Sequence, residues 1–168
     1  IGGSEDDEGL GITSDSAENI LVVGKTNSNG LSSRLNSNYT IHDNTKNNQD
    51  GFLAKFDSSG QRYFITYFGG TASDYANSVT SGLEDTIFIC GTTRSSNGIS
   101  NSNSARGDDD IFIARFTEKG ALSRSCYFGD TLSDKSSSIN FFPPFVYMVG
   151  TTNSQKKIAQ NGLVMLPS

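Results

Sequence analysis

Short runs of apolar residues separated by polar turns dominate the hydrophobic pattern of this chain. Some runs, such as Ile20–Val23 and Ile87–Cys90, are apolar at every position, which is typical of strands covered on both faces. In Asp50–Phe56 every second residue from Phe52 onward is apolar, as in a strand with one apolar and one mixed face. Gly, Asn, Asp or Ser bounds the runs, and no segment shows helical periodicity. The pattern predicts an all-β fold.

Four sequence blocks recur in one order, about every 60 residues along the chain. The first begins with Gly and places Asp7, Asp74 and Asp134 at the same offset. The second is an apolar run that ends in Gly-x-Thr-x-Ser, at 19–28, 86–95 and 145–154. The third spans 50–56 and 110–116, with a degraded copy at 161–166, and the fourth spans 63–69 and 122–129. Each repeat therefore encodes four antiparallel strands.

Repeats of this length with four strands each are typical of β-propeller blades. The chain holds about 2.75 of them: blade unit 1 at 1–67, blade unit 2 at 68–127 and an incomplete blade unit 3 at 128–168. A propeller needs at least four blades to close. We therefore expect an incomplete ring, or a part of a larger propeller or assembly. Residue 1 is Ile rather than Met, which points to a mature product or a fragment.

The blocks resemble the SBBP-type bacterial β-propeller repeat. The resemblance is carried by Gly69-Gly70…Asp74…Val79, by Ile87-Phe-Ile-Cys-Gly91-Thr-Thr-Arg-Ser95, by Asp50-Gly-Phe-Leu-Ala-Lys-Phe56 and by Gly60-Gln-Arg-Tyr-Phe-Ile-Thr-Tyr-Phe-Gly-Gly70. Departures in the third unit, among them Asp130 for the second Gly and Phe142-Pro143-Pro144 for a Gly-Asn turn, mark a terminal or degenerate blade. The resemblance implies a propeller in a secreted or cell-surface protein. It implies no shared catalytic activity and no ligand.

Composition narrows the function classes. The net charge is −5 and no Lys/Arg cluster offers a basic face, so nucleic acid is not an expected partner. No apolar stretch is long enough to span a membrane. Cys90 and Cys126 lie in apolar strand runs and are expected to be buried thiols rather than a bridge. The single His42, in a polar loop, does not favour a histidine-based metal or catalytic site.

The recurring aspartates are the first candidates for a functional site. Asp6 and Asp7, with acidic neighbours, could bind Ca²⁺, which takes carboxylate and carbonyl ligands. The alternative is structural: each recurring Asp accepts loop N–H groups and ties one blade to the next. Repetition in all three units favours the structural interpretation, and no other cofactor is expected. The cluster Asp108–Asp110 is interpreted as a solvated turn.

The recurring Thr and Ser residues offer no nucleophile, because no His or other paired base accompanies them. They are expected to hydrogen-bond the loop backbone instead. Sugar-cleaving propellers and many sugar-binding propellers depend on Trp platforms, and the chain has no Trp. The sequence therefore predicts a non-enzyme.

The predicted function is a non-catalytic, secreted or cell-surface module that binds a protein or glycan through its variable loops, at 28–49 and 96–109. The alternative is a structural subunit of an extracellular assembly, completed by other copies or partner chains that pair with an open edge strand. A propeller enzyme is the third hypothesis.

Overall fold

The computed structural model describes residues 1–105 and 107–155 of the chain. One 3₁₀ turn, η1 (Leu83–Asp85), is the only helical element in that part. The eleven strands are β1 (Asp7–Ser14), β2 (Ile20–Thr26), β3 (Ser33–Arg34), β4 (Asp50–Phe56), β5 (Arg62–Phe68), β6 (Asp74–Ser81), β7 (Ile87–Thr93), β8 (Asp110–Phe116), β9 (Leu122–Phe128), β10 (Asp134–Phe142) and β11 (Phe145–Thr152).

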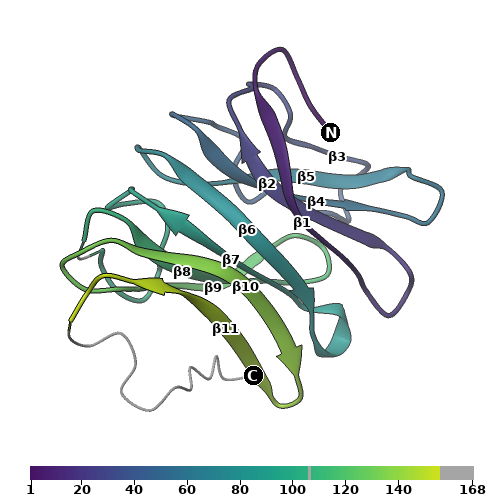
Figure 1. Ribbon diagram of the computed structural model, residues 1–168. Helices are drawn as coiled ribbons and strands as arrows, with labels where there is room; N and C mark the ends of the chain where they lie inside the picture. Colours follow the sequence, from purple (N-terminus) through teal and green to yellow (C-terminus); the bar gives the residue numbers. More distant parts are fainter. Residues whose placement is uncertain (106, 156–168) are drawn as a thin grey trace.

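The strands form three antiparallel sheets, one after another along the chain (Figure 1). The first sheet has the order β1-β2-β4-β5-β3, the second β6-β7-β8-β9, and the third the pair β10-β11. The predicted fold class, an all-β chain of antiparallel propeller-like sheets, is confirmed. The short β3, which pairs with β5, is a fifth strand that the repeat did not predict. The degraded block at 161–166 lies outside the described residues.

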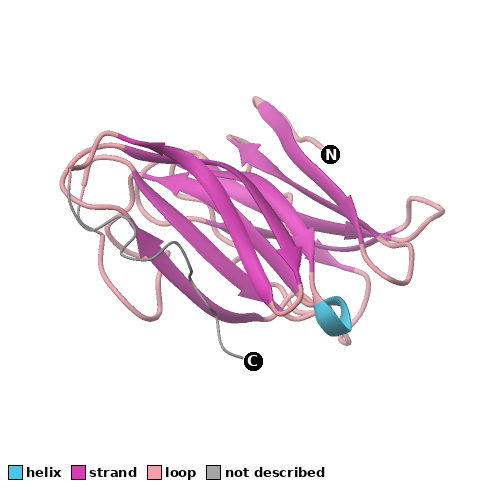
Figure 2. Cartoon of the chain, turned by 60° about the horizontal axis from the view of Figure 1, so that its bottom comes forward, coloured by secondary structure: helices cyan, strands magenta, loops and turns pink. Residues whose placement is uncertain are grey.

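The sheets pack face to face, with β6 lying between β1 and β10 (Figures 1 and 2). A larger core fills the space between the first and second sheets, around Leu21, Phe68 and Phe112, which are fully buried. A smaller core, around Phe88 and Ile139, joins the second sheet to the third. The apolar residues of these two cores are thus buried by the stacking of one sheet on the next. A third cluster, of Phe52, Ala54 and Ile65, is buried within the first sheet itself, with Leu31 packed against it. Cys90 lies in the second core as a buried free thiol, and Cys126 is a half-buried free thiol.

The first strand of each sheet carries a bulge at the same position of the repeat. The register shifts at Leu10 in β1, at Asn77 in β6 and at Ser137 in β10. A bulge leaves its extra residue outside the ladder and redirects that side chain. Asn77 and Ser137 are thereby placed at the junction between the second and third sheets.

The two variable loops cover the outer edges of β5 and β9. In the first, the N–H of Leu35 donates to the Tyr63 carbonyl at 2.7 Å, and the N–H of Tyr67 donates to the Asp43 carbonyl at 3.1 Å. In the second, the Asn103 amide donates to the Tyr127 carbonyl and accepts the Tyr127 N–H, both at 2.8 Å. Covering these edges satisfies backbone groups that would otherwise invite strand addition.

Candidate functional site

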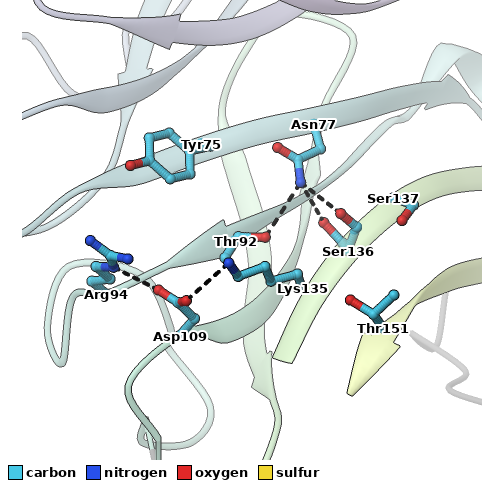
Figure 3. Close-up of a pocket in the computed structure, with 9 residues that line it drawn as sticks. All are labelled: Tyr75, Asn77, Thr92, Arg94, Asp109, Lys135, Ser136, Ser137 and Thr151. Atoms are coloured by element: carbon cyan, nitrogen blue, oxygen red, sulfur yellow. Dashed lines mark hydrogen bonds and ion pairs between the residues drawn. The ribbon is translucent and has the colours of Figure 1, made fainter. Parts of the chain in front are cut away.

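A pocket of about 400 Å³ opens between the second and third sheets, beside β6 and β10 (Figure 3). Every side chain that lines it carries a polar group. The residues that line it are Tyr75, Asn77, Thr92, Arg94, Asp109, Lys135, Ser136, Ser137 and Thr151. They come from four strands, from Arg94 directly after β7 and from Asp109 directly before β8, so only the stacking of two sheets assembles them.

Asp109 is the central charge of the pocket. One of its carboxylate oxygens lies 2.7 Å from Arg94 Nε, and the other lies 3.5 Å from Lys135 Nζ. That second oxygen also accepts a hydrogen bond from Ser133 Oγ at 2.8 Å. Burial alone would raise the pKa of Asp109, but the hydrogen bonds and charges of these neighbours hold it below its usual value. Asp109 is therefore a fixed anion at neutral pH.

This placement corrects the interpretation of 108–110 as a solvated turn. Asp109 is only 6% exposed and Asp110 only 2%. Asp109 is buried because its main-chain carbonyl accepts the Asp134 N–H at 2.7 Å, which draws this end of the loop against the third sheet. A buried carboxylate requires charged or hydrogen-bonding partners, and Arg94 and Lys135 supply them.

The side chains of Arg94 and Lys135 contact Asp109 and also face solvent. Both side chains are 56% exposed. In the part of the chain that the structure describes, the two terminal nitrogens of Arg94 donate no hydrogen bond. The hydroxyl groups of Tyr75 and Ser137 likewise have no hydrogen-bond partner among those residues. These groups are available to a ligand.

Asn77 fixes the floor of the pocket. Its amide nitrogen donates to the Ser136 main-chain carbonyl at 2.7 Å and lies 3.2 Å from Ser136 Oγ. It also lies 3.4 Å from Thr92 Oγ1 (Figure 3). Because Asn77 is the bulge residue of β6, its side chain reaches across to β10 and holds the two sheets in register.

The predicted calcium residues lie elsewhere, at the start of β1. Asp7 accepts hydrogen bonds from the Gly3 N–H at 2.7 Å, from Ser28 Oγ at 2.8 Å and from Thr26 Oγ1. Burial raises the pKa of Asp7, but these donors outweigh it and leave the pKa lowered. Asp6 is exposed, and its carbonyl accepts the Asn27 N–H at 2.9 Å. Asp6 and Asp7 stay an untested candidate for calcium, beside the structural alternative that the sequence favours.

Two of these hydrogen bonds, from the main-chain N–H and from the Ser hydroxyl, recur in the other two units. Asp74 accepts from the Gly70 N–H at 2.7 Å and from Ser95 Oγ at 2.8 Å. Asp134 accepts from the Asp130 N–H at 3.0 Å and from Ser154 Oγ at 2.9 Å. In all three units the Thr hydroxyl accepts the N–H of the following Ser, at 2.9 to 3.0 Å. The hydrogen bonds expected for the recurring Asp, Thr and Ser residues are therefore present.

The recurring Asp also links neighbouring sheets through its main chain. The Asp74 N–H donates to the carbonyl of Gln49, the residue before β4, at 2.7 Å. The Asp134 N–H donates to the carbonyl of Asp109, the residue before β8, at the same distance.

Across residues 1–105 and 107–155, no three His, Cys, Asp or Glu side chains gather closely enough to hold a metal ion. In the same residues, no helix is long and apolar enough to cross a membrane.

Comparison with known proteins agrees with the repeat. Residues 1–32 match the profile of the SBBP family, described as a beta-propeller repeat. These residues are similar to an SBBP repeat. The match covers the Asp7, Thr26 and Ser28 network described above, and the expected family resemblance is confirmed. No curated protein matches the chain.

The pocket differs from the SBBP network because its charged residues do not repeat. Gln49 occupies in the first unit the position of Asp109, and Asn27 occupies that of Arg94. The corresponding junction of the first and second sheets thus lacks this ion pair. The sequence contained one signal that could have identified the site: an Asp immediately before the recurring Asp110, in one unit only.

Proposed function

We propose that this chain is a non-catalytic β-propeller module, secreted or displayed at the cell surface, that binds a glycan in the pocket between its second and third sheets. The observation that carries the proposal is the difference between the polar residues that repeat in every unit and the polar residues that line the pocket. The repeated Asp, Thr and Ser side chains are engaged within the protein, whereas Arg94, Tyr75 and Ser137 hold donors for which residues 1–105 and 107–155 supply no acceptor. Pockets with a few convergent polar groups are the usual form of small-ligand sites.

The chemistry of the wall suits a hydroxyl-rich ligand. Asp109 accepts hydrogen bonds and the guanidinium of Arg94 donates them. Lys25 Nζ lies over the Tyr75 ring, 5.4 Å from its centroid, and the other side of that ring is the apolar surface for a sugar face. With both cations beside it, Asp109 is a weak base and a poor proton acceptor for catalysis. This is the physical support for a binding role rather than an enzymatic one. The extracellular location rests on the resemblance to SBBP proteins.

The experiment is a screen of the full chain on an array of immobilised glycans, followed by calorimetric titration of any hit. Arg94→Ala and Tyr75→Ala should each weaken binding about tenfold or more, since each removes a direct ligand contact. Arg62→Ala removes an exposed cation remote from the pocket and is the matched control. The proposal fails if no glycan binds, or if binding is the same in the pocket variants. A polypeptide partner lost in Arg94→Ala would replace the glycan as the ligand.

A further inference from the structure

Arg94 binds Asp109 through one nitrogen and keeps the end of its guanidinium for another acceptor. Its Nε lies 2.7 Å from a carboxylate oxygen of Asp109, whose side chain is only 8% exposed. The two terminal nitrogens donate no hydrogen bond to any residue that the structure describes. These nitrogens form the edge of a guanidinium that pairs with a carboxylate through two parallel hydrogen bonds. Asp109 therefore orients a two-donor fork before a ligand arrives.

The charged side chains that line the pocket favour an anionic ligand. They are two cations, Arg94 and Lys135, and one anion, Asp109, in a chain whose net charge is −5. Asp108, whose charge also acts on Arg94, is exposed and does not line the pocket, so solvent screens it. A cleft lined by an excess of one sign of charge attracts ligands of the opposite sign.

A third cation borders the pocket beside Tyr75. Lys25 Nζ lies over the Tyr75 ring, 5.4 Å from its centroid. It also lies 2.9 Å from a carboxylate oxygen of Glu8, in a pair that is open to solvent. Tyr75 and Arg94 lie at the same end of the pocket and are close enough to interact electrostatically (Figure 3). A sugar on the free side of the Tyr75 ring would therefore place a charged substituent near Arg94.

We propose that the ligand of this pocket is an acidic sugar, whose carboxylate is bound by Arg94 and Lys135 while its ring lies against Tyr75. The inference rests on the proposed function and narrows its ligand class from glycans to those that carry a uronic or sialic acid. The hydroxyl groups of Tyr75 and Ser137 remain available to the sugar hydroxyl groups. The excess of one cation over the anions of the lining matches a single carboxylate rather than a densely sulfated chain.

The test is calorimetric titration of the full chain with trimers of galacturonic acid, trimers of mannuronic acid and sialyllactose, each beside its methyl ester. The ester keeps the sugar and removes the negative charge, so each pair isolates the contribution of the carboxylate. We expect at least one acid to bind about tenfold or more tightly than its ester. The difference should shrink at high salt, because ions screen charges that are open to solvent.

Variants assign this preference to the guanidinium fork. Arg94→Gln should bring acid and ester to the same affinity, whereas Arg94→Lys keeps the charge without the fork and should retain part of the preference. Tyr75→Ala should weaken acid and ester by the same factor, because the ring contacts the sugar and not its carboxylate. Arg62→Ala, remote from the pocket, is the matched control. Thermal melts verify that the variants fold.

The outcomes separate this inference from the proposed function. If a neutral glycan binds and is lost in Tyr75→Ala, while no acid binds more tightly than its ester, glycan binding stands and the acidic ligand is overturned. A dextran sulfate fragment that binds more tightly than every acid of the panel overturns it in favour of a sulfated ligand. A chain that binds no glycan contradicts both proposals.

Discussion

Lys55 and Asp15 form an ion pair inside the protein, with Lys55 Nζ 2.8 Å from an oxygen of Asp15 and side chains only 5% and 0% exposed. Lys55 also donates to the Glu118 carbonyl of the second sheet's hairpin, at 3.2 Å. Burial raises the pKa of Asp15, but Lys55 and Asn19 outweigh it and leave the pKa lowered. The pair therefore joins the β1–β2 turn, β4 and the neighbouring sheet.

Replacement of Lys55 by Met should destabilise the chain by about 3 kcal/mol at neutral pH, since it leaves Asp15 as a buried charge without its cation. Urea denaturation measures the change. Because the pKa of Asp15 is depressed in the folded state, its stabilising contribution is present at neutral pH and is lost as pH falls through that folded value. The difference between variant and wild type should therefore shrink in acid. Lys119→Met, at an exposed lysine, is the control.

Asp50 should make the chain less stable as pH rises. Burial raises its pKa from 3.8 to about 6, and the charges of Asp74 and Asp43 add to this against the Asn47 N–H and Lys46. Because the pKa of Asp50 is higher in the folded than in the unfolded chain, its contribution to stability is fully present below the unfolded pKa. This contribution is lost as pH rises through the folded pKa. Asp50→Asn has no carboxyl to titrate at this position and does not suffer this loss. Between pH 4 and pH 7 its free energy of unfolding should therefore rise by about 2 to 3 kcal/mol relative to that of the wild type.

Urea denaturation at a series of pH values measures that difference. Asp6→Asn, at an exposed carboxylate, should track the wild type throughout. A difference between Asp50→Asn and the wild type that stays constant with pH would contradict the prediction.

The recurring glycine of the second block should tolerate no side chain. A Cβ at Gly91 would lie 2.0 Å from the Tyr75 carbonyl and 2.3 Å from the Phe112 ring. Strand β6 approaches Gly91 closely here, just before the β6 bulge at Asn77. Gly91→Ala should therefore lower the free energy of unfolding by about 2 kcal/mol or more. Gly9→Ala meets only Val22, at 4.0 Å, and should leave the thermal melting temperature nearly unchanged. Equal effects of the two substitutions would show that the close approach is not the reason for the glycine.

The Asp74 hydrogen bonds should matter for stability. Asp74→Ala removes the acceptor of the Gly70 N–H and of the buried Ser95 hydroxyl. An unsatisfied buried donor costs about 1 to 3 kcal/mol, so chemical denaturation should show a loss of that order. Ser95→Ala, which removes one donor and keeps the carboxylate, should cost less.

Calcium at Asp6 and Asp7 can be tested by calorimetric titration. Because the Asp7 carboxylate already accepts donors from Gly3, Ser28 and Thr26, we expect no binding heat and no rise in melting temperature. Heat that disappears in Asp6→Asn would establish the metal site and show that the loop rearranges to form it.

Much of the fold could be predicted from the sequence, because local patterns encode it. The apolar runs of β2 and β7 and the turns that bound them gave the strands, and repetition of Asp74 and Asp134 gave their grouping into sheets. The bulges could not be predicted, since at Asn77 and Ser137 nothing in the residue type signals an extra position in the ladder. Lys55 appeared only as one residue of a mixed strand face, because its partner Asp15 lies 40 residues earlier.

The candidate site depended on tertiary structure. Arg94 and Asp109 lie at the two ends of the connection between β7 and β8, and Lys135 lies on β10. They converge because the third sheet stacks on the second, and only that stacking excludes water enough to bury Asp109.

The sequence by itself determined which residues repeat, and so the strands and the Asp, Thr and Ser hydrogen bonds of every unit, because these are short-range contacts set by spacing. Only the tertiary structure decided which equivalent positions are covered. Ile12 and Val79 obey the same pattern, yet one is exposed and the other buried. Whether such a position is buried depends on a neighbouring sheet, and the local sequence does not specify which sheets lie next to each other.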